Sequence, residues 1–322
     1  MIDRLLAFDT AALDAIQGLR CPFLDAVMPF ISGLGDGGAV WIGLTLVLML
    51  FRKTRKTGYM MALALVLGLL IGNLTLKPLI ARIRPYDANP DVTPLIDRLS
   101  DYSFPSGHTQ NIVGTTASIF ASRKEAWVRI VCVVLMLLVP FSRMYLGVHT
   151  PLDVGVAFLT ALALAAALYP AFRTEAAAKK TVPWLLLGAA ALCGGYLVYA
   201  SSLARCDWPA GSEDLSNITH GLKNAYTMLG ALLGFLIVYI ADEKKLHFDV
   251  RAPFWGQVLK LVLGLALLLG IKAGLKPVLV SLFAGSQAES FVRYFLIVLF
   301  AGIIWPLTFP FFAKLGKKGK AA

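Results

Sequence analysis

Apolar runs long enough to cross a lipid bilayer recur along this chain and limit its fold more than any other feature. A helix of about 20 apolar residues spans the hydrocarbon core, and its backbone polar groups must pair within the segment. The sequence therefore predicts an all-α fold, a polytopic transmembrane helix bundle of about nine spans. The expected spans cover about residues 37–51, 57–76, 108–122, 126–141, 152–172, 182–201, 221–241, 254–274 and 291–313.

The composition supports a membrane protein and bears on its partners. Hydrophobic residues make up 58% of the 322 residues and charged residues only 15%, against about 45–50% apolar residues in soluble domains. The mean hydropathy is +0.72. The net charge of +11 is a feature of nucleic-acid-binding proteins. Here, however, the basic residues flank the apolar runs, so we expect membrane lipids as neighbours and no nucleic acid.

More than half of the 30 Lys and Arg residues lie at alternate span boundaries, and the positive-inside rule places these boundaries in the cytoplasm. The opposite boundaries then face outward, and among them is the stretch from Lys77 to Asp153. We expect an integral protein of a bacterial plasma membrane, with its N-terminus extracytoplasmic and its C-terminus cytoplasmic. The cytoplasmic basic residues are Arg52, Lys53, Arg55, Lys56, Arg123, Lys124, Arg129, Arg173, Lys179, Lys180, Lys244, Lys245, Arg251, Lys314, Lys317, Lys318 and Lys320.

The segment before the first span is too charged to cross the bilayer. Its apolar residues Leu5, Leu6, Phe8, Leu13 and Ile16 predict an amphipathic helix in the membrane interface. We therefore divide the chain into an interfacial segment at 1–36, a core of about five spans at 37–172, and about four further spans at 173–322. The role of these last spans is open, with a homodimer contact among the alternatives.

Three cations lie at the outer ends of the predicted spans: Lys77, Arg84 and Arg143. A phosphate dianion in a partly dehydrated pocket needs such partners, and an arginine can bind it through two parallel hydrogen bonds. Each cation alone has a second interpretation, because span-end Lys and Arg side chains also extend to lipid headgroups. Charged groups beside a bilayer are costly, so their gathering calls for a function.

Two histidine-containing motifs accompany these cations. Pro105-Ser106-Gly107-His108 opens the third span, where a capping hydroxyl and a glycine let backbone N–H groups point at an anion. His149 and Asp153 begin the fifth span four residues apart, so they can share a helix face. A carboxylate on one ring nitrogen leaves the other free to act as a nucleophile. Alone, each motif is also compatible with an ordinary helix cap.

Taken together, the order and spacing of these residues resemble the signature of the type 2 phosphatidic acid phosphatase superfamily. The pieces are Lys77 with Arg84-Pro85, then Pro105 to His108, then Ser142-Arg143 with His149 and Asp153. The resemblance covers about residues 57–172. It implies a membrane phosphatase core that hydrolyses a lipid phosphate or diphosphate at the extracytoplasmic face without a metal or other cofactor.

The resemblance also implies a role for each residue. Lys77, Arg84 and Arg143 hold the phosphate oxygens, and Ser106 with the Gly107 N–H adds hydrogen bonds. His149 is the nucleophile that forms a phosphohistidine, with Asp153 orienting it. His108 protonates the leaving group and then activates water.

The substrate and the final acceptor stay open from the sequence. Polyprenyl diphosphate, phosphatidic acid, phosphatidylglycerophosphate and a sphingoid phosphate all place a tail in lipid and a head in the polar site. The alternatives are a lipid phosphotransferase that uses the same intermediate, a phosphatase for soluble esters, and a transporter or scaffold with a vestigial site. The complete set of motif residues counts against the last of these.

Overall fold

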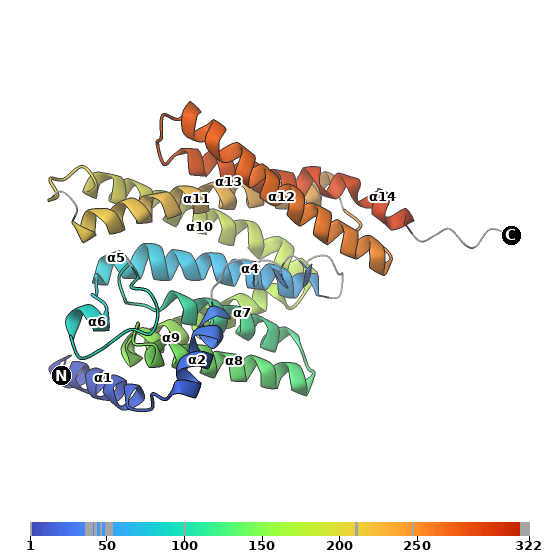
Figure 1. Cartoon of the computed structure of the whole chain (residues 1–322). Helices are drawn as coiled ribbons and strands as arrows, with labels where there is room; N and C mark the ends of the chain where they lie inside the picture. The colour runs from blue at the N-terminus through green and yellow to red at the C-terminus, as the bar shows by residue number, and fades with distance from the viewer. Residues whose placement is uncertain are drawn as a thin grey trace. The chain divides into compact units, whose positions relative to one another are not determined.

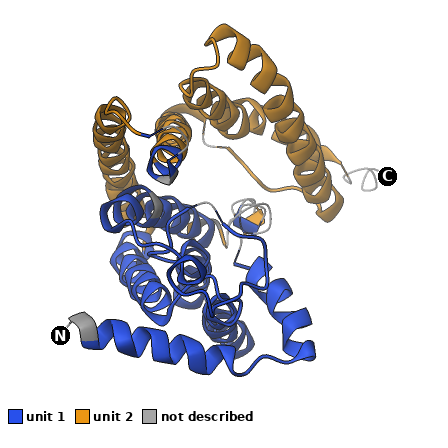
Figure 2. Ribbon diagram, turned by 60° about the vertical axis from the view of Figure 1, so that its left-hand side comes forward, with its two compact units in different colours: residues 1–45, 57–173, 209–217 blue, residues 46–56, 174–208, 218–322 orange. Residues whose placement is uncertain are grey.

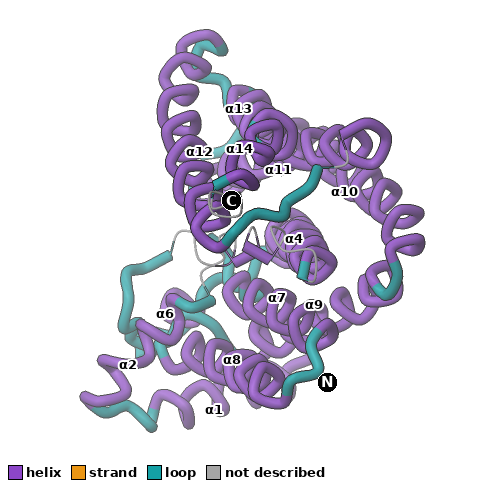
Figure 3. The backbone as a smooth tube through the Cα atoms, turned by 90° about the vertical axis from the view of Figure 1, so that its right-hand side faces the viewer, coloured by secondary structure: helices purple, strands orange, loops and turns teal. Residues whose placement is uncertain are grey.

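The structure, a computed structural model, describes residues 2–35, 41, 44–45, 47–48, 54–99, 101–209, 212–246 and 248–315. This part of the chain consists of helices and the loops that join them (Figures 1 and 3). Seven of its segments are long and apolar enough to cross a membrane, which confirms an all-helical protein with multiple candidate spans. They are Lys56–Ala88, Ala126–Tyr145, Pro151–Phe172, Ala176–Leu203, Asp214–Leu246, Phe254–Leu282 and Glu289–Lys314.

These seven segments correspond to the second and the fourth to ninth of the expected spans. The first expected span, 37–51, lies mostly outside the described residues. The third is helix α7 (Gly107–Ser122), whose 16 residues are fewer than the roughly 20 that a full crossing requires.

Several predicted boundaries are wrong. Helix α8 (Ala126–Tyr145) does not end at 141 but continues past Pro140 and includes Arg143. The Arg143 side chain points inward and bonds to the buried Ser32 hydroxyl. Its charge therefore lies inside the protein and does not mark the end of the helix. Helices α10 (Glu175–Leu203) and α11 (Glu213–Ala241) begin earlier than expected, and α12 (Phe254–Leu282) ends later. These differences arise because the expected spans include only the apolar runs, whereas each helix continues into the polar residues on either side of its run.

The chain divides into two compact units (Figure 2). One comprises Met1–Thr45, Thr57–Arg173 and Pro209–Asn217, and the other comprises Leu46–Lys56, Thr174–Trp208 and Ile218–Ala322. The predicted division at 36 and 172 stays a prediction. All residues proposed for chemistry belong to the first unit.

In the first unit, α7 packs against both α8 and α9 (Pro151–Phe172). The segment before it consists of α4 (Arg55–Leu69), a π-helical stretch Leu70–Leu76, and the short helices α5 (Lys77–Ile80) and α6 (Pro85–Ala88). The N-terminal helices α1 (Ile2–Gln17) and α2 (Pro22–Gly33) pack against α8. These elements therefore form one packed group of helices.

A buried apolar cluster stabilises this group of helices. It joins α1 and α2 to the loop residues that flank the site, and its members are Leu13, Met28, Tyr86, Val92, Tyr145, Leu146 and Val148. Burying a large apolar side chain contributes about 1.5–3 kcal/mol. Leu13, predicted at the membrane interface, is thus packed within the protein, whereas Leu5, Leu6 and Phe8 on the same helix are exposed.

In the second unit, α10 and α11 are joined by a hydrogen bond from the Cys193 Sγ to the Ala225 carbonyl at 3.2 Å. Helix α11 meets α13 (Glu289–Leu299) at Gly230, where a Cβ atom would lie 2.2 Å from the Phe291 carbonyl oxygen. Helix α12 packs against α13 and α14 (Phe309–Lys314). A π-helical turn Phe300–Ile304 and a 3₁₀ turn Pro306–Thr308 connect α13 to α14, and another π-helical turn, Asp242–Leu246, follows α11.

Candidate active site

The first turns of α7 and α9 lie together at one end of the first unit. Ser106 is the N-cap of α7, as predicted, and its Oγ accepts a hydrogen bond from the Thr109 N–H at 3.4 Å. The Ser106 N–H donates to the Asp153 carbonyl at 3.1 Å, which ties α7 to the first turn of α9. Gly107 is the first residue of α7. The Pro-Ser-Gly-His turn is thus joined directly to the second motif.

Helix α9 begins with a capping box. Pro151 occupies its first turn, as predicted. The Thr150 Oγ1 accepts from the Asp153 N–H at 3.4 Å, and the Asp153 Oδ2 accepts from the Thr150 N–H at 2.9 Å. This reciprocal pairing satisfies two helix-end donors. It also fixes the Asp153 carboxylate beside His149, the residue just before the cap.

His149 and Asp153 are buried, with 1% and 0% of their surfaces exposed. The His149 Nδ1 lies 3.6 Å from the Asp153 Oδ2. The Ser103 hydroxyl donates to the same carboxylate oxygen and lies 3.4 Å from Nδ1. The other ring nitrogen, Nε2, lies 3.4 Å from the Arg84 Nη1. One side of the imidazole therefore faces a carboxylate and the other faces a cation.

Lys77 and Arg84 meet at one carboxylate. Both side chains are buried, and both form an ion pair with Asp101, whose side chain is 48% exposed. The Arg84 Nε also donates to the Asp101 carbonyl at 2.9 Å, and its Nη1 donates to the Val148 carbonyl at 2.9 Å. These bonds orient the Arg84 guanidinium next to His149.

Arg143 lies in the last turn of α8, with 2% of its surface exposed, and its Nη1 donates to the Ser32 hydroxyl at 2.6 Å. His108 is half-buried in the first turn of α7. It interacts electrostatically with Arg143, Lys77 and Arg84. The structure thus gathers all eight residues that the sequence singled out at one end of the first unit.

The surroundings set the charge of the groups outside the spans. Burial, with Arg84 and Arg143 nearby, lowers the pKa of His149 to about 3, so its imidazole is neutral at neutral pH. Partial burial raises the pKa of Asp101, but the positive charges of Lys77 and Arg84 outweigh this effect and hold the pKa well below its usual range. The site therefore combines a neutral His149 imidazole with an ionised Asp101 carboxylate that pairs with Lys77 and Arg84.

Sequence reasoning missed four contributors to this site: Asp9, Arg82, Asp101 and Ser103. Arg82 joins Asp153 to Asp9, with N–O distances of 2.9 and 2.6 Å. Two signals were present in the sequence. Arg82 is another charge within the Lys77–Arg84 stretch beside the bilayer. Asp9 is a carboxylate on the helix face that carries Leu13 and Ile16. Nothing in the sequence marks Asp101 or Ser103.

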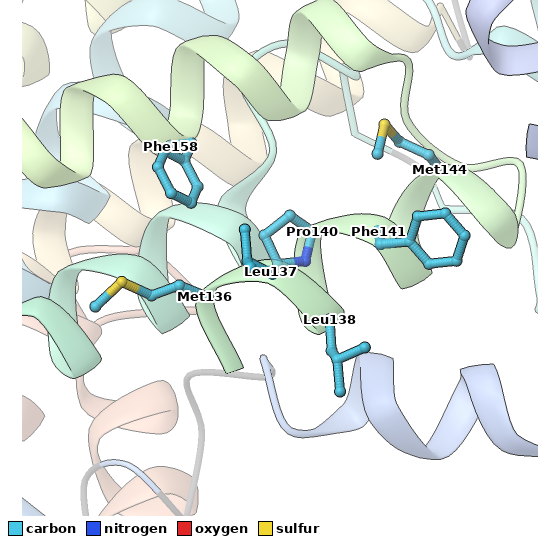
Figure 4. A pocket seen from close by; sticks show the side chains of 7 residues that line it. All are labelled: Met136, Leu137, Leu138, Pro140, Phe141, Met144 and Phe158. Carbon is cyan, nitrogen blue, oxygen red and sulfur yellow. The ribbon is translucent and has the colours of Figure 1, made fainter. Parts of the chain in front are cut away.

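Among the described residues, no group of three or more His, Cys, Asp or Glu side chains is arranged to hold a metal ion. An apolar hollow of about 440 Å³ lies on α8 and α9 (Figure 4). Its lining is Met136, Leu137, Leu138, Pro140, Phe141, Met144 and Phe158. Along α8 the lining runs from Met144, the residue after Arg143, to Met136, about 12 Å at 1.5 Å per residue.

Comparison with known proteins identifies the class. The sequence profile of the PAP2 superfamily matches residues 53–177, and that of the PAP2 superfamily phosphatase transmembrane extension matches residues 226–318. The chain therefore belongs to the PAP2 superfamily of membrane lipid phosphatases and carries the transmembrane extension.

Curated relatives match about half of the chain. An undecaprenyl-diphosphatase of Sulfolobus acidocaldarius is 35% identical over 155 residues, 48% of this chain and 73% of the relative. Phosphatidylglycerophosphatase B of Bacillus subtilis is 33% identical over 168 residues, 48% of this chain and 79% of the relative. A lipid A 4'-phosphatase of Bacteroides thetaiotaomicron is 29% identical over 168 residues, 48% of this chain and 72% of the relative.

Two solved structures are also similar. The crystal structure of Aquifex aeolicus LpxE is 25% identical with a TM-score of 0.46, covering 50% of this chain and 93% of that one. The transmembrane PAP2-type phosphatidylglycerolphosphate phosphatase of Bacillus subtilis is 32% identical with a TM-score of 0.43, covering 52% of this chain and 86% of that one.

Proposed function

We propose that this protein hydrolyses a lipid phosphate or diphosphate at the extracytoplasmic face of the membrane, through a phosphohistidine on His149. One observation carries the proposal. The His149 Nδ1 faces Asp153 and Ser103, while its Nε2 lies 3.4 Å from Arg84. The imidazole is neutral, and its Nδ1 side is held by Asp153 and Ser103, so the Nε2 atom next to Arg84 is free to attack. This arrangement suits in-line attack on a phosphate bound by Arg84.

In the first step, the His149 Nε2 forms a bond to phosphorus, and the bond from phosphorus to the leaving oxygen breaks. His108 donates a proton to that oxygen. Lys77, Arg84 and Arg143 hold the phosphate oxygens, where charge is greatest in the transition state. Asp153 stabilises the positive charge that develops on the imidazole ring.

In the second step, water attacks phosphorus and the phosphorus–nitrogen bond breaks. His108, now unprotonated, takes the proton from water, which returns both histidines to their initial state and releases inorganic phosphate. Ser106 and the Gly107 N–H donate hydrogen bonds to the phosphate oxygens in both steps. Metal ions are not needed in these steps, because the three cations supply the positive charge.

A lipid substrate agrees with the surroundings of the site. The lining of the apolar hollow on α8 and α9 includes Met144 (Figure 4), the residue that follows Arg143 in α8, so we infer that the tail of a lipid whose phosphate is held by Arg143 lies in this hollow. The named relatives act on undecaprenyl diphosphate, phosphatidylglycerophosphate and lipid A phosphate. We take the first two as the leading substrates, with phosphatidic acid and sphingoid phosphates as further members of the test panel.

The test is phosphate release by the purified protein across this panel, with water-soluble phosphate esters in the same detergent. We expect release from one or more lipid phosphates, none by His149→Ala or His108→Ala, and normal folding of both variants. Equal turnover by His149→Ala refutes the nucleophile. Transfer of labelled phosphate to an added lipid or sugar, with little release, supports a phosphotransferase instead.

We also propose nine spans, with the N-terminus and the site outside the plasma membrane and the C-terminus in the cytoplasm. Cys21 is an exposed free thiol in the site-bearing unit. In a Cys206→Ser variant, a membrane-impermeant maleimide added to intact cells should label Cys21. Labelling only after the membrane is opened contradicts this orientation.

A further inference from the structure

Asp9 is a buried carboxylate on the N-terminal helix, with 3% of its surface exposed. Its Oδ1 accepts a hydrogen bond from the Leu152 N–H at 2.7 Å, in the first turn of α9. Its Oδ2 accepts from the Arg82 Nη2 at 2.6 Å. A buried charge is costly unless it is paired and hydrogen-bonded, and both Asp9 oxygens are paired with elements of the active site.

Arg82 connects Asp9 to the proposed catalytic carboxylate. The Arg82 Nη1 donates to the Asp153 Oδ1 at 2.9 Å and to the Thr150 Oγ1 at 3.0 Å. The Arg82 carbonyl accepts from the Ser103 N–H at 2.8 Å, and the Ser103 hydroxyl in turn donates to Asp153. One arginine therefore fixes both oxygens of Asp153, directly on Oδ1 and through Ser103 on Oδ2.

We propose that Asp9 and Arg82 are positioning residues of the reaction: they hold Asp153 against His149, and Asp9 balances the charge of Arg82. This inference rests on the function proposed above. Asp153 can stabilise the positive charge that develops on the His149 ring only if its own negative charge is not already cancelled by a neighbouring cation. An arginine whose only counter-ion is Asp153 cancels much of that charge, because the two side chains are in direct contact in a region of low dielectric.

Asp9 removes this conflict. Asp9, Arg82 and Asp153 together carry a net charge of −1, so a full negative charge stays available for the imidazolium of the phosphohistidine step. A neutral side chain at position 9 reduces the sum to zero. The loss then falls on the chemical step, since the two oxygens of Asp9 accept from Arg82 and from the Leu152 N–H, and neither of these groups is proposed to hold the phosphate.

The experiment uses purified full-length protein with a lipid phosphate that the wild type hydrolyses. Asp9→Asn is compared with Asp14→Asn, an exposed aspartate of the same helix. We measure kcat, the rate of phosphoenzyme formation in a single turnover, and the inhibition constant of inorganic phosphate. Removing the hydrogen-bonding partner of a metal ligand typically costs about 10–100-fold in activity, and we take the same range for the partner of a reactive carboxylate.

For Asp9→Asn we expect kcat and phosphoenzyme formation to fall about 10–100-fold, with the inhibition constant of phosphate within about twofold of wild type. Asp14→Asn should match the wild type in all three. An unchanged kcat in Asp9→Asn overturns the proposal. So does a parallel loss of activity and phosphate binding, because this is the result of α1 merely holding the fold together.

A second variant keeps the charge argument testable if Asp9→Asn is unstable. In the double variant Asp9→Asn/Arg82→Gln, the uncompensated cation is gone and Asp153 regains its charge. Because Arg82→Gln alone also removes a positioning contact, we expect non-additivity: the kcat loss of the double variant should be at least about threefold smaller than the product of the losses in Asp9→Asn and Arg82→Gln. Losses that simply multiply overturn the charge balance. If the wild type forms no phosphoenzyme at all, the proposed function fails first, independently of Asp9.

Discussion

Asp101 contacts the two cations that the proposed mechanism gives to the substrate phosphate. Its carboxylate pairs with both Lys77 and Arg84, so phosphate must compete with an internal anion for them. Replacing Asp101 with asparagine removes the charge and keeps the size. Because the backbone carbonyl accepts the Arg84 Nε bond at 2.9 Å, the loop retains one of its attachments.

The magnitude follows from the exposure of this carboxylate. The Asp101 side chain is 48% exposed, so each ion pair is treated as an exposed one, worth about 0.5–1 kcal/mol. The two pairs together oppose phosphate binding by about 1–2 kcal/mol, or about 5- to 30-fold in affinity. We therefore expect Asp101→Asn to lower the inhibition constant of inorganic phosphate by about this factor.

The assay is inhibition of lipid phosphate hydrolysis by inorganic phosphate, checked by calorimetric titration of the purified variant. Asp97→Asn is the matched control, since Asp97 is an exposed residue of the same loop, and its inhibition constant should equal that of the wild type. If phosphate binds Asp101→Asn no more tightly than wild type, or less tightly, the carboxylate orients the cations rather than competing for them, and the reasoning is refuted.

Three further predictions follow from the same geometry. Because the pKa of Asp101 is lower in the folded protein than in the unfolded chain, its ion pairs stabilise the fold above about pH 4; thermal unfolding of wild type and Asp101→Asn should therefore converge as the pH falls below this value. Ser103→Ala loses the hydroxyl that donates to Asp153, so kcat should fall about tenfold with KM nearly unchanged, and an equal change in KM contradicts this. Leu137→Trp fills part of the apolar hollow, so kcat/KM should fall for long-chain lipid phosphates and not for a short-chain analogue, whereas an equal loss on both places the tail elsewhere.

The sequence predicted the helical class and the helix starts at the two histidine motifs well, because both depend on local patterns. Apolar runs are long and continuous, so seven of the predicted spans have a counterpart among the described segments that are long and apolar enough to cross a membrane. The Ser106 cap and Pro151 at the start of α9 depend on neighbouring residues only. Helix ends were less accurate, since Arg143 was taken as a boundary residue and instead lies inside α8.

The supporting contacts could not be predicted, because they join residues far apart in the chain. The link between Asp9 and Arg82 spans 73 residues, and that between Ser103 and Asp153 spans 50. Loop residues such as Asp101 follow no periodic pattern, so nothing local shows which cation they contact. A polar residue on the apolar face of an amphipathic helix, as Asp9 is, remains the most useful local signal of such a partner.

The covalent intermediate tests the central claim most directly. A phosphorus-labelled lipid substrate is mixed with the purified protein, the reaction is stopped with alkali within milliseconds, and the labelled peptide is sequenced. The account predicts label on His149 that is stable to alkali and lost in acid, and no label in His149→Ala. Full hydrolysis of the substrate with no labelled protein at any time, or label on another residue, contradicts it.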